Sequence, residues 1–242
     1  MLSKKEIKDI QSLRYKKQRD EARLFVAEGP KVVSELAQIL PDGIEKIYAL
    51  SSWANEHQEV KNKIEIISEI ELEKLSALQT PNQVIGVFKQ LQNSEPQLSV
   101  NEFYIYLDAI QDPGNFGTIV RIADWFGIKN IVCTEGCADA YNAKVVQASM
   151  ASIGRVNFFL DQDYQWLQQQ KLPLYAATLQ GKPLSAIEKN RGGIVMIGNE
   201  SKGLNAQLIA LATEQITIRR IGEAESLNAA VATGIILSHL IS

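Results

Sequence analysis

Apolar and polar positions alternate along the chain in a pattern that predicts two α/β regions. In the first region, residues 24–40 read as a short strand, a Gly-Pro turn and a helix, and residues 64–78 as a strand running into a helix. The β-branched runs at 44–50 and 84–90 predict two further strands. From Phe103 onward, apolar strand-like runs alternate with helix-like segments, which predicts a mostly parallel sheet with both faces covered.

Residues 90–101 separate the two regions, because they are polar, contain Pro96 and show no periodicity. Gly154 is expected to close a helix that starts near residue 143, and Ser226 is expected to N-cap the last helix. The expected domain organisation is a small α/β sandwich at 1–95, a linker at 96–101 and a larger α/β domain at 102–242.

The charge distribution suggests a functional role in one segment only, residues 1–23. The formal net charge is −3, and 45% hydrophobic with 22% charged residues is ordinary for a globular protein, so composition gives no overall signature of nucleic-acid binding. Residues 1–23, which include a helix-like segment at about 3–19, nevertheless hold eight basic side chains against four acidic ones. Such a local excess can contact phosphate groups, and it is equally typical of a solvated amphipathic helix face.

Cysteines and apolar runs indicate neither a metal centre nor a membrane anchor. Cys133 and Cys137 lack the spacing of a zinc half-site or a CxxC motif, and no histidine is near them, so we interpret them as reduced thiols. Clustered carboxylates or His–Cys sets that would suggest a metal are also missing from the sequence pattern. Without a run of about 18 apolar residues or the apolar core of a signal peptide, a cytoplasmic protein is expected.

The first of three motifs, residues 107–127, joins a strand to a helix through the turn Asp112-Pro113-Gly114-Asn115-Phe116-Gly117. Its spacing is not that of a dinucleotide-binding GxGxxG turn. The turn residues alone are explained by a strand-to-helix connection in which Asn115 caps the helix. Arg121 lies one to two turns into that helix and suits a bidentate grip on phosphate, with a surface ion pair to Asp124 as the alternative.

Two further motifs follow strand-like runs nearer the C-terminus. In residues 197–204, Gly198 permits a close backbone approach by a ligand, and Glu200 can cap a helix, pair with an arginine or touch substrate. In residues 216–235, Ser226 and Asn228 start a helix rich in alanine and glycine. These small residues allow another backbone to come close, either within the chain or from a partner subunit.

In this order and spacing, the three motifs resemble the signature motifs of the SpoU family of RNA 2'-O-ribose methyltransferases, within the knotted SPOUT superfamily. The resemblance implies a trefoil knot that binds S-adenosylmethionine without a metal, and a homodimer formed through the first-motif helix and the last helix. The residues that it places around the cofactor are Ile197, Gly198, Asn199, Ile218 and Leu227. The residues that match the family's functional polar positions, taken here as catalytic, are Asn115, Arg121, Glu200, Ser226 and Asn228.

Residues 12–36 and 80–88 resemble the family's N-terminal substrate-binding domain, whose fold is similar to a ribosomal protein that binds RNA kink-turns. This resemblance implies a structured RNA substrate. It favours ribosomal RNA over tRNA, because tRNA-directed relatives often use short helical extensions instead. The residues expected to contact RNA are Arg14, Lys16, Lys17, Arg19 and Lys31.

The implied reaction is in-line attack of a ribose 2'-hydroxyl on a sulfonium methyl group, for which positioning supplies much of the acceleration. Because arginine stays protonated at any working pH, Arg121 is expected to hold phosphate and stabilise the developing alkoxide rather than act as a literal base. The chain departs from the family at Ser201, at Ala229, and at Arg219-Arg220, which replaces a common Pro-Met pair. A non-catalytic RNA-binding dimer, and a generic nucleotide-binding α/β enzyme, stay open as alternatives.

Overall fold

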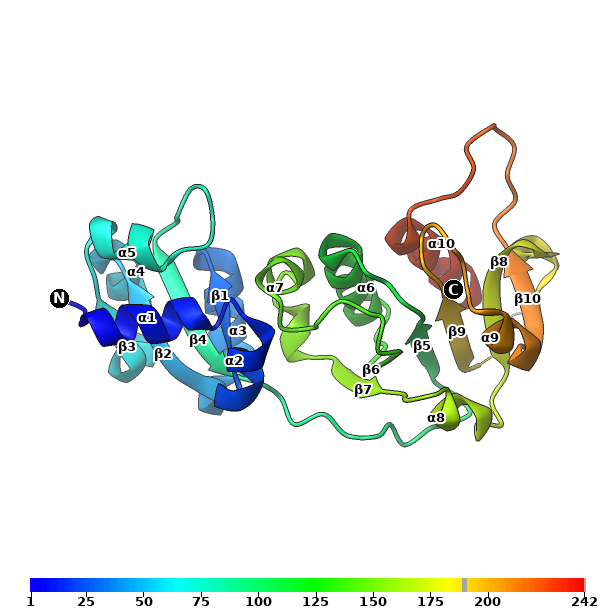
Figure 1. Ribbon diagram of the computed structural model, residues 1–242, viewed down its shortest axis with the longest axis horizontal. Coiled ribbons are helices and arrows are strands. Elements are labelled where there is room, and N and C mark those ends of the chain that lie inside the picture. The colour runs from blue at the N-terminus through cyan, green and yellow to red at the C-terminus, as the bar shows by residue number, and fades with distance from the viewer. Residues whose placement is uncertain (189–190, 242) are drawn as a thin grey trace. The chain divides into compact units, whose positions relative to one another are not determined.

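The computed structural model describes residues 1–188 and 191–241, and the chain forms two compact units (Figure 1). Unit 1 comprises Met1–Gln92 and Asp139–Arg155, and unit 2 comprises Asn93–Ala138 and the described chain from Val156 onward. The chain therefore enters unit 1 twice. The domain limits expected from the sequence stay a prediction.

Unit 1 is built on a four-stranded sheet in the order β1-β4-β2-β3. β4 pairs antiparallel with both β1 and β2, and β2 pairs in parallel with β3. The strands are β1 (Leu24–Glu28), β2 (Ile44–Ala49), β3 (Ile64–Ile66) and β4 (Val84–Lys89). The helices are α1 (Lys4–Ser12), α2 (Lys16–Ala22), α3 (Pro30–Ile39), α4 (Ser51–Glu56), α5 (Glu69–Leu75) and α7 (Ala143–Ser149). All four expected strands are confirmed, whereas α4 is absent from the sequence-based expectations.

The basic N-terminal segment forms two helices instead of the single one expected at about 3–19. Ser3 caps α1 in a capping box, in which its hydroxyl accepts from the Glu6 amide and the Glu6 carboxylate accepts from the Ser3 amide. α1 ends at Ser12, and α2 runs from Lys16 to Ala22, where its C-cap residue Arg23 adopts a left-handed conformation with φ 56°. Residues 13–15 therefore separate the two helices.

α7 stops short of Gly154, where the sequence predicted its end. Met150 and Ala151 both have positive φ, 49° and 72°, which a right-handed helix does not contain. Gly154 instead serves packing, since a Cβ there would lie 3.1 Å from Leu36 Cδ2. The glycine was therefore correctly singled out, but for the wrong reason.

Unit 2 is built on a six-stranded sheet in the order β10-β8-β9-β5-β6-β7, in which every pairing is parallel. The mostly parallel sheet expected from the sequence is thereby confirmed. The strands are β5 (Phe103–Leu107), β6 (Asn130–Cys133), β7 (Asn157–Leu160), β8 (Leu174–Pro183), β9 (Gly193–Ile197) and β10 (Glu214–Thr217). The helices are α6 (Pro113–Trp125), α8 (Gln165–Gln168), α9 (Ala206–Leu211) and α10 (Ala229–Ile241).

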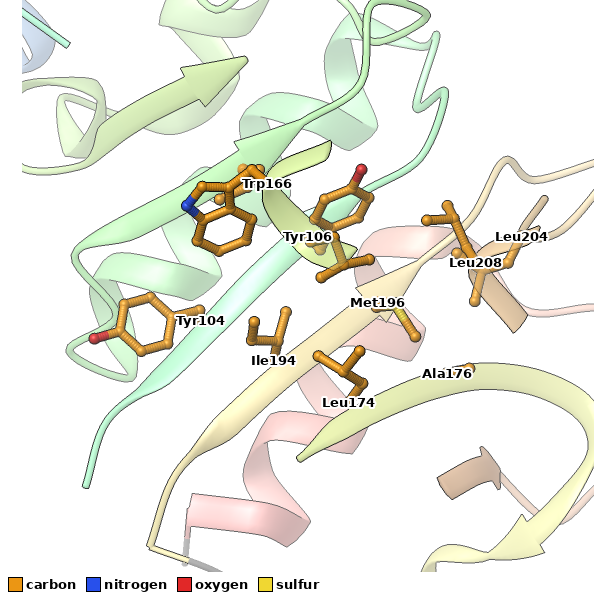
Figure 2. Packing of buried hydrophobic residues seen from close by; sticks show 11 residues of the cluster. Tyr104, Tyr106, Trp166, Leu174, Ala176, Ile194, Met196, Leu204 and Leu208 are labelled. Carbon is orange, nitrogen blue, oxygen red and sulfur yellow. The ribbon is translucent and has the colours of Figure 1, made fainter. Parts of the chain in front are cut away.

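The core of unit 2 lies on both faces of this sheet. Figure 2 shows one face, where Tyr106 and Met196 from adjacent strands pack with Leu208 of α9, and Trp166 of α8 covers the same cluster. Ile105 points to the opposite face by the alternation of a strand and is equally buried. Figure 1 draws α6 and α10 on the side of the sheet away from α8. Both faces are thus covered, as expected for a parallel sheet.

The strand order reverses between β5 and β9. From β5 the chain continues to β6 on one side, and from β9 it continues to β10 on the other. Parallel sheets bind ligands at such a switch point, outside the carboxyl ends of the strands. The first and second motifs follow β5 and β9, so the fold brings them together at this edge of the sheet. In the described residues, no helix has the length and hydropathy that a membrane span requires.

Candidate functional site

The site begins with two loops that leave the sheet at the switch point. Ala109, just after β5, has φ 53°, a left-handed conformation that is costly for a residue with a Cβ. Its amide donates to Thr134 Oγ1 at 3.0 Å, and its carbonyl accepts from Asn199 Nδ2 at 2.9 Å. The loop after β9 therefore holds the loop after β5 in this conformation.

Asn199 shapes the second loop, as well as joining it to the first. Its backbone exchanges two hydrogen bonds with Gly203, of 3.1 and 2.8 Å, and its Oδ1 accepts from the amides of Ser201 and Lys202. Gly198 is required for the same closure, because a Cβ there would lie 2.3 Å from the backbone of Gly203. The side of Gly198 that lacks a Cβ thus faces the loop's own backbone.

Asn115 is the point at which all three motifs meet. Its Nδ2 donates to Glu200 Oε1 at 2.7 Å, and its Oδ1 accepts from Asn228 Nδ2 at 2.7 Å. Asn115 does not cap α6, because Asp112 occupies the N-cap and its Oδ1 accepts from the Asn115 amide at 2.7 Å. Glu200 likewise bonds a side chain rather than a helix end. The two capping alternatives for these residues are therefore wrong.

Asn228 also has the cap position that the sequence assigned to Ser226. The amides of Ala230 and Val231 donate to Asn228 Oδ1 at 3.0 and 3.2 Å, and α10 starts at Ala229. Ser226 is exposed, two residues outside the cap. The prediction failed because Ser, Asn and Asp are similarly good caps, so composition does not distinguish them.

Arg121 is exposed on α6, one to two turns beyond Asn115. Across residues 1–188 and 191–241 it forms no hydrogen bond or ion pair, so the alternative of an ion pair with Asp124 is not seen. An exposed guanidinium with all five donors available is suited to a planar anion.

The expected cofactor residues lie at the carboxyl edge of the sheet. Ile197 is buried at the end of β9, Ile218 is half-buried just after β10, and Leu227 is 46% exposed. The loop from Arg219 to Asn228 is exposed at every position. The backbone after β10 is consequently accessible to a ligand.

Thr178 is a candidate that the sequence reasoning missed. Its Oγ1 is buried without a hydrogen-bond partner. Ala176 of β8 pairs with Met196 of β9. Thr178 and Gly198 each lie two residues further along, so they are at the same level of the sheet. A buried hydroxyl without a partner is costly and calls for an explanation. The available signal was a threonine within the apolar strand-like run at residues 174–179.

The residues expected to contact RNA fall into two groups. Arg19 is buried, pairs with Asp139 and donates to the carbonyls of Leu13 and Arg14, so it is a structural residue and leaves the RNA-binding set. Arg14 is exposed but donates to the carbonyls of Leu75 and Ser76 at the end of α5. The three exposed lysines are Lys16, paired with Asp20 at 2.5 Å, Lys17, paired with Glu21 at 3.9 Å, and Lys31.

Cys133 and Cys137 are free thiols. A hydrogen bond between the two side chains, with burial, raises the pKa of Cys133, and the same bond lowers the pKa of Cys137. The Cys137 thiol donates to the carbonyl of Leu107 at 3.2 Å, beside the turn after β5. Within the described chain, no group of His, Cys, Asp or Glu side chains has an arrangement that would hold a metal ion.

The arrangement fits a sulfonium cofactor and a phosphate-bearing substrate. The exposed backbone after β10 is accessible to a polar cofactor at the carboxyl edge, and the buried Thr178 hydroxyl lacks a hydrogen-bond partner. Asn115 and Glu200 provide a fixed polar pair nearby, and Arg121 supplies an anion-binding group.

Comparison with known proteins agrees with this geometry. Residues 102–238 match the model of the SpoU rRNA Methylase family, and residues 4–86 match that of an MRM3-like substrate binding domain. The 23S rRNA (guanosine(2553)-2'-O)-methyltransferase RlmP of Bacillus subtilis is 30% identical over 240 residues, covering 97% of this chain and 95% of that protein.

Two solved structures match over nearly the whole chain. An RNA methyltransferase of the TrmH family from Porphyromonas gingivalis superposes with a TM-score of 0.86 at 33% identity, covering 99% of this chain and 98% of that one. An AdoMet-bound rRNA methyltransferase from Sinorhizobium meliloti gives a TM-score of 0.86 at 28% identity, with 99% and 95% covered. The chain therefore belongs to the SpoU rRNA methylase family.

Proposed function

We propose that this protein transfers the methyl group of S-adenosylmethionine to a ribose 2'-hydroxyl of ribosomal RNA. The observation that carries the proposal is the hydrogen-bonded chain Asn228–Asn115–Glu200, which joins one side chain from each motif with bonds of 2.7 Å. The family match and the rRNA-directed relatives support the same reaction. A trefoil knot at this site is part of the proposal.

The cofactor supplies an electrophilic methyl group with a good leaving group, so the protein's task is mainly to position the nucleophile. Glu200 accepts from Asn115 and thereby fixes the orientation of the Asn115 amide. Asn228 donates to the other end of the same amide and is itself fixed as the cap of α10. With Ser226 in the adjoining loop, these side chains hold the ribose against the reacting centre.

Arg121 binds the phosphate of the target nucleotide and stabilises the alkoxide that develops as the 2'-hydroxyl loses its proton. The phosphate held by Arg121 receives that proton. This role suits an exposed arginine that is not paired within the described chain.

Gly198 and Ile218 border the proposed cofactor site with their backbones, and Leu227 covers it from the loop before α10. Ile197 anchors the end of β9, and Asn199 shapes the loop that follows. Thr178 joins this set as a hydroxyl that the cofactor would satisfy.

Unit 1 would bind the RNA. The match to an MRM3-like substrate binding domain at residues 4–86 supports this assignment. Lys16, Lys17 and Lys31 are the exposed cations proposed to contact phosphate, with Arg14 shared between α5 and RNA. Ribosomal RNA is preferred to tRNA because the Bacillus subtilis and Sinorhizobium meliloti relatives, which span nearly the whole chain, are named as rRNA methyltransferases.

A homodimer formed through α6 and α10 is the proposed assembly. Trp125 is 85% exposed, and on α10, which packs against α6, Val231 and Ile235 are 51% and 40% exposed. We propose that these side chains form one apolar patch, the kind of surface that marks an interaction site. Phe126 lies next to Trp125 and is partly buried. We expect the dimer to act in the cytoplasm.

The direct test is methyl transfer from labelled S-adenosylmethionine to ribosomal RNA from a strain that lacks this protein. Wild type is expected to transfer, and Arg121→Ala and Asn115→Ala to lose most of the activity. Equal transfer by all three proteins would overturn the assignment. Failure of the wild type to bind the cofactor in calorimetry would point instead to a non-catalytic RNA-binding dimer. Mapping the 2'-O-methyl sites that the deletion removes then identifies the ribose.

A further inference from the structure

The loop between β10 and α10 carries two consecutive arginines that the site described above does not use. Arg219 and Arg220 follow β10, which ends at Thr217, and the loop from 219 to 228 is exposed throughout. Figure 1 shows this loop standing away from the body of unit 2 between β10 and α10. Ile221, the next residue, is 91% exposed.

Neither arginine is neutralised by its neighbours. Glu223 and Glu225 lie in the same loop, yet within residues 1–188 and 191–241 neither arginine forms an ion pair with them. Arg220 Nη1 donates to the carbonyl of Ala224 at 3.4 Å, a long bond that leaves its other donors available, and Arg219 has no hydrogen bond in the same described ranges. Most donors of the two exposed guanidinium groups therefore face solvent without a protein acceptor in the described residues.

The position of the pair ties it to the substrate side of the site. β10 runs parallel to β8 and β9, so its carboxyl end lies at the same sheet edge as Gly198. The loop that begins with the arginines ends at Asn228, which donates to Asn115. Lys202, also exposed, lies in the loop after β9 at this edge, and Arg121 is exposed on α6, the helix that begins there. The loops at this edge thus hold Lys202, Arg219 and Arg220 together with Glu200, Glu223 and Glu225, of which Glu200 accepts from Asn115.

We propose that Arg219 and Arg220 bind phosphates of the RNA strand next to the target nucleotide, and so position the ribose from the cofactor-loop side. This inference rests on the proposed function. Arginine forms paired hydrogen bonds with phosphate oxygens, and such contacts set the register of a nucleic acid on a protein without reading its sequence. An acidic protein partner is the competing occupant, and the experiment below separates the two.

The test compares the full-length variant Arg219→Ala/Arg220→Ala with Lys129→Ala/Lys171→Ala. The control removes the same charge from exposed residues just before β6 and β8, at the amino edge of the same sheet. A 23S rRNA transcript is the probe, its affinity is measured across salt concentrations, and cofactor affinity is measured by calorimetry. Each lost phosphate contact lowers the salt slope of log K by about 0.7 to 0.9.

We expect the arginine variant to lower the salt slope by about 1 to 2 and to weaken RNA binding at least tenfold, with cofactor affinity within twofold of wild type. The lysine control should leave the slope unchanged. Arg219→Lys/Arg220→Lys should retain most of the slope, since the charge remains. An unchanged slope overturns the inference in favour of an acidic protein partner. A loss of cofactor affinity with RNA affinity retained overturns it as well. Wild-type cofactor binding and methyl transfer, measured in parallel, test the proposed function separately.

Discussion

The amide of Asn115 donates to the carboxylate of Glu200 at 2.7 Å, although the two residues are 85 positions apart in the sequence. The contact exists because β5 and β9 are neighbours at the point where the strand order reverses. A hydrogen bond to a charged acceptor contributes more than a neutral one, about 1.5–3 kcal/mol. It therefore fixes the direction in which the Asn115 amide points.

Asn115→Asp should lower kcat for methyl transfer by about 10- to 100-fold, the kinetic equivalent of one lost charge-assisted hydrogen bond. The new carboxylate can no longer donate to Glu200 and repels it instead. Stopped assays with saturating cofactor and RNA measure the effect, and circular dichroism confirms the fold.

The double variant Asn115→Asp/Glu200→Gln provides the matched control. The glutamine amide can donate to the new carboxylate, so the pair is restored with donor and acceptor exchanged. We expect the double variant to be more active than Asn115→Asp and at least as stable. Strictly additive losses would show that the two side chains act independently.

Asn228 has two tasks that substitutions can separate. Asn228→Ala removes the cap of α10 and should destabilise the protein by about 1 kcal/mol, with loss of activity. Asn228→Ser keeps a capping hydroxyl but removes the donor to Asn115, so activity should fall while stability stays near wild type. Thermal unfolding and methyl transfer are measured on both. Ser226→Ala should leave thermal stability unchanged, and a cost equal to that of Asn228→Ala would contradict the assignment of the cap.

The sequence allowed the parallel sheet and the three motifs to be predicted, because strand patterning and turn composition are local properties. The hydrogen-bond and ion-pair partner of each side chain could not be predicted in the same way, because it depends on the tertiary structure. Asp112 rather than Asn115 caps α6, and Asn228 rather than Ser226 caps α10. Each outcome depends on a shift of two or three residues in where the helix starts. The burial of Arg19 beside Asp139, 120 positions away, depends on tertiary packing that a count of basic residues does not register.

Thr178→Val should weaken S-adenosylmethionine binding by about 3- to 10-fold, the cost of one hydrogen bond of 0.5–1.5 kcal/mol. Without the cofactor, the same change removes a buried hydroxyl that has no partner, so the melting temperature should stay level or rise. Thr233→Val is the control, since the Thr233 hydroxyl is buried but already donates to the Ala229 carbonyl at 2.7 Å. For Thr233→Val, calorimetry should show unchanged cofactor affinity and thermal unfolding should show a lower melting temperature. Equal cofactor affinities for wild type and Thr178→Val would show that Thr178 is not part of the site.

Acid should reveal the contribution of Glu71 in unit 1. Hydrogen bonds from the amides of Ser68 and Leu2 and from the Ser68 hydroxyl lower the pKa of Glu71 to about 2, from an ordinary value of 4.5. Because the folded pKa is the lower one, the stabilisation is complete above about pH 4.5 and is lost as pH falls towards 2. The difference in free energy of unfolding between wild type and Glu71→Gln should therefore be constant from pH 7 to 5 and shrink below that. A difference independent of pH down to 3 would show that the carboxylate charge is not involved.

The proposed dimer surface predicts an oligomer that depends on exposed apolar side chains of α6 and α10. Trp125→Glu/Ile235→Glu places two charges where a partner would exclude water, and we expect it to convert the dimer to a monomer in sedimentation velocity, with circular dichroism unchanged. Ile70→Glu, at a 64% exposed position on α5, is the control and should leave the dimer intact. If the Trp125/Ile235 variant sediments like wild type, the interface lies elsewhere. If methyl transfer also survives in a true monomer, one chain holds a complete site.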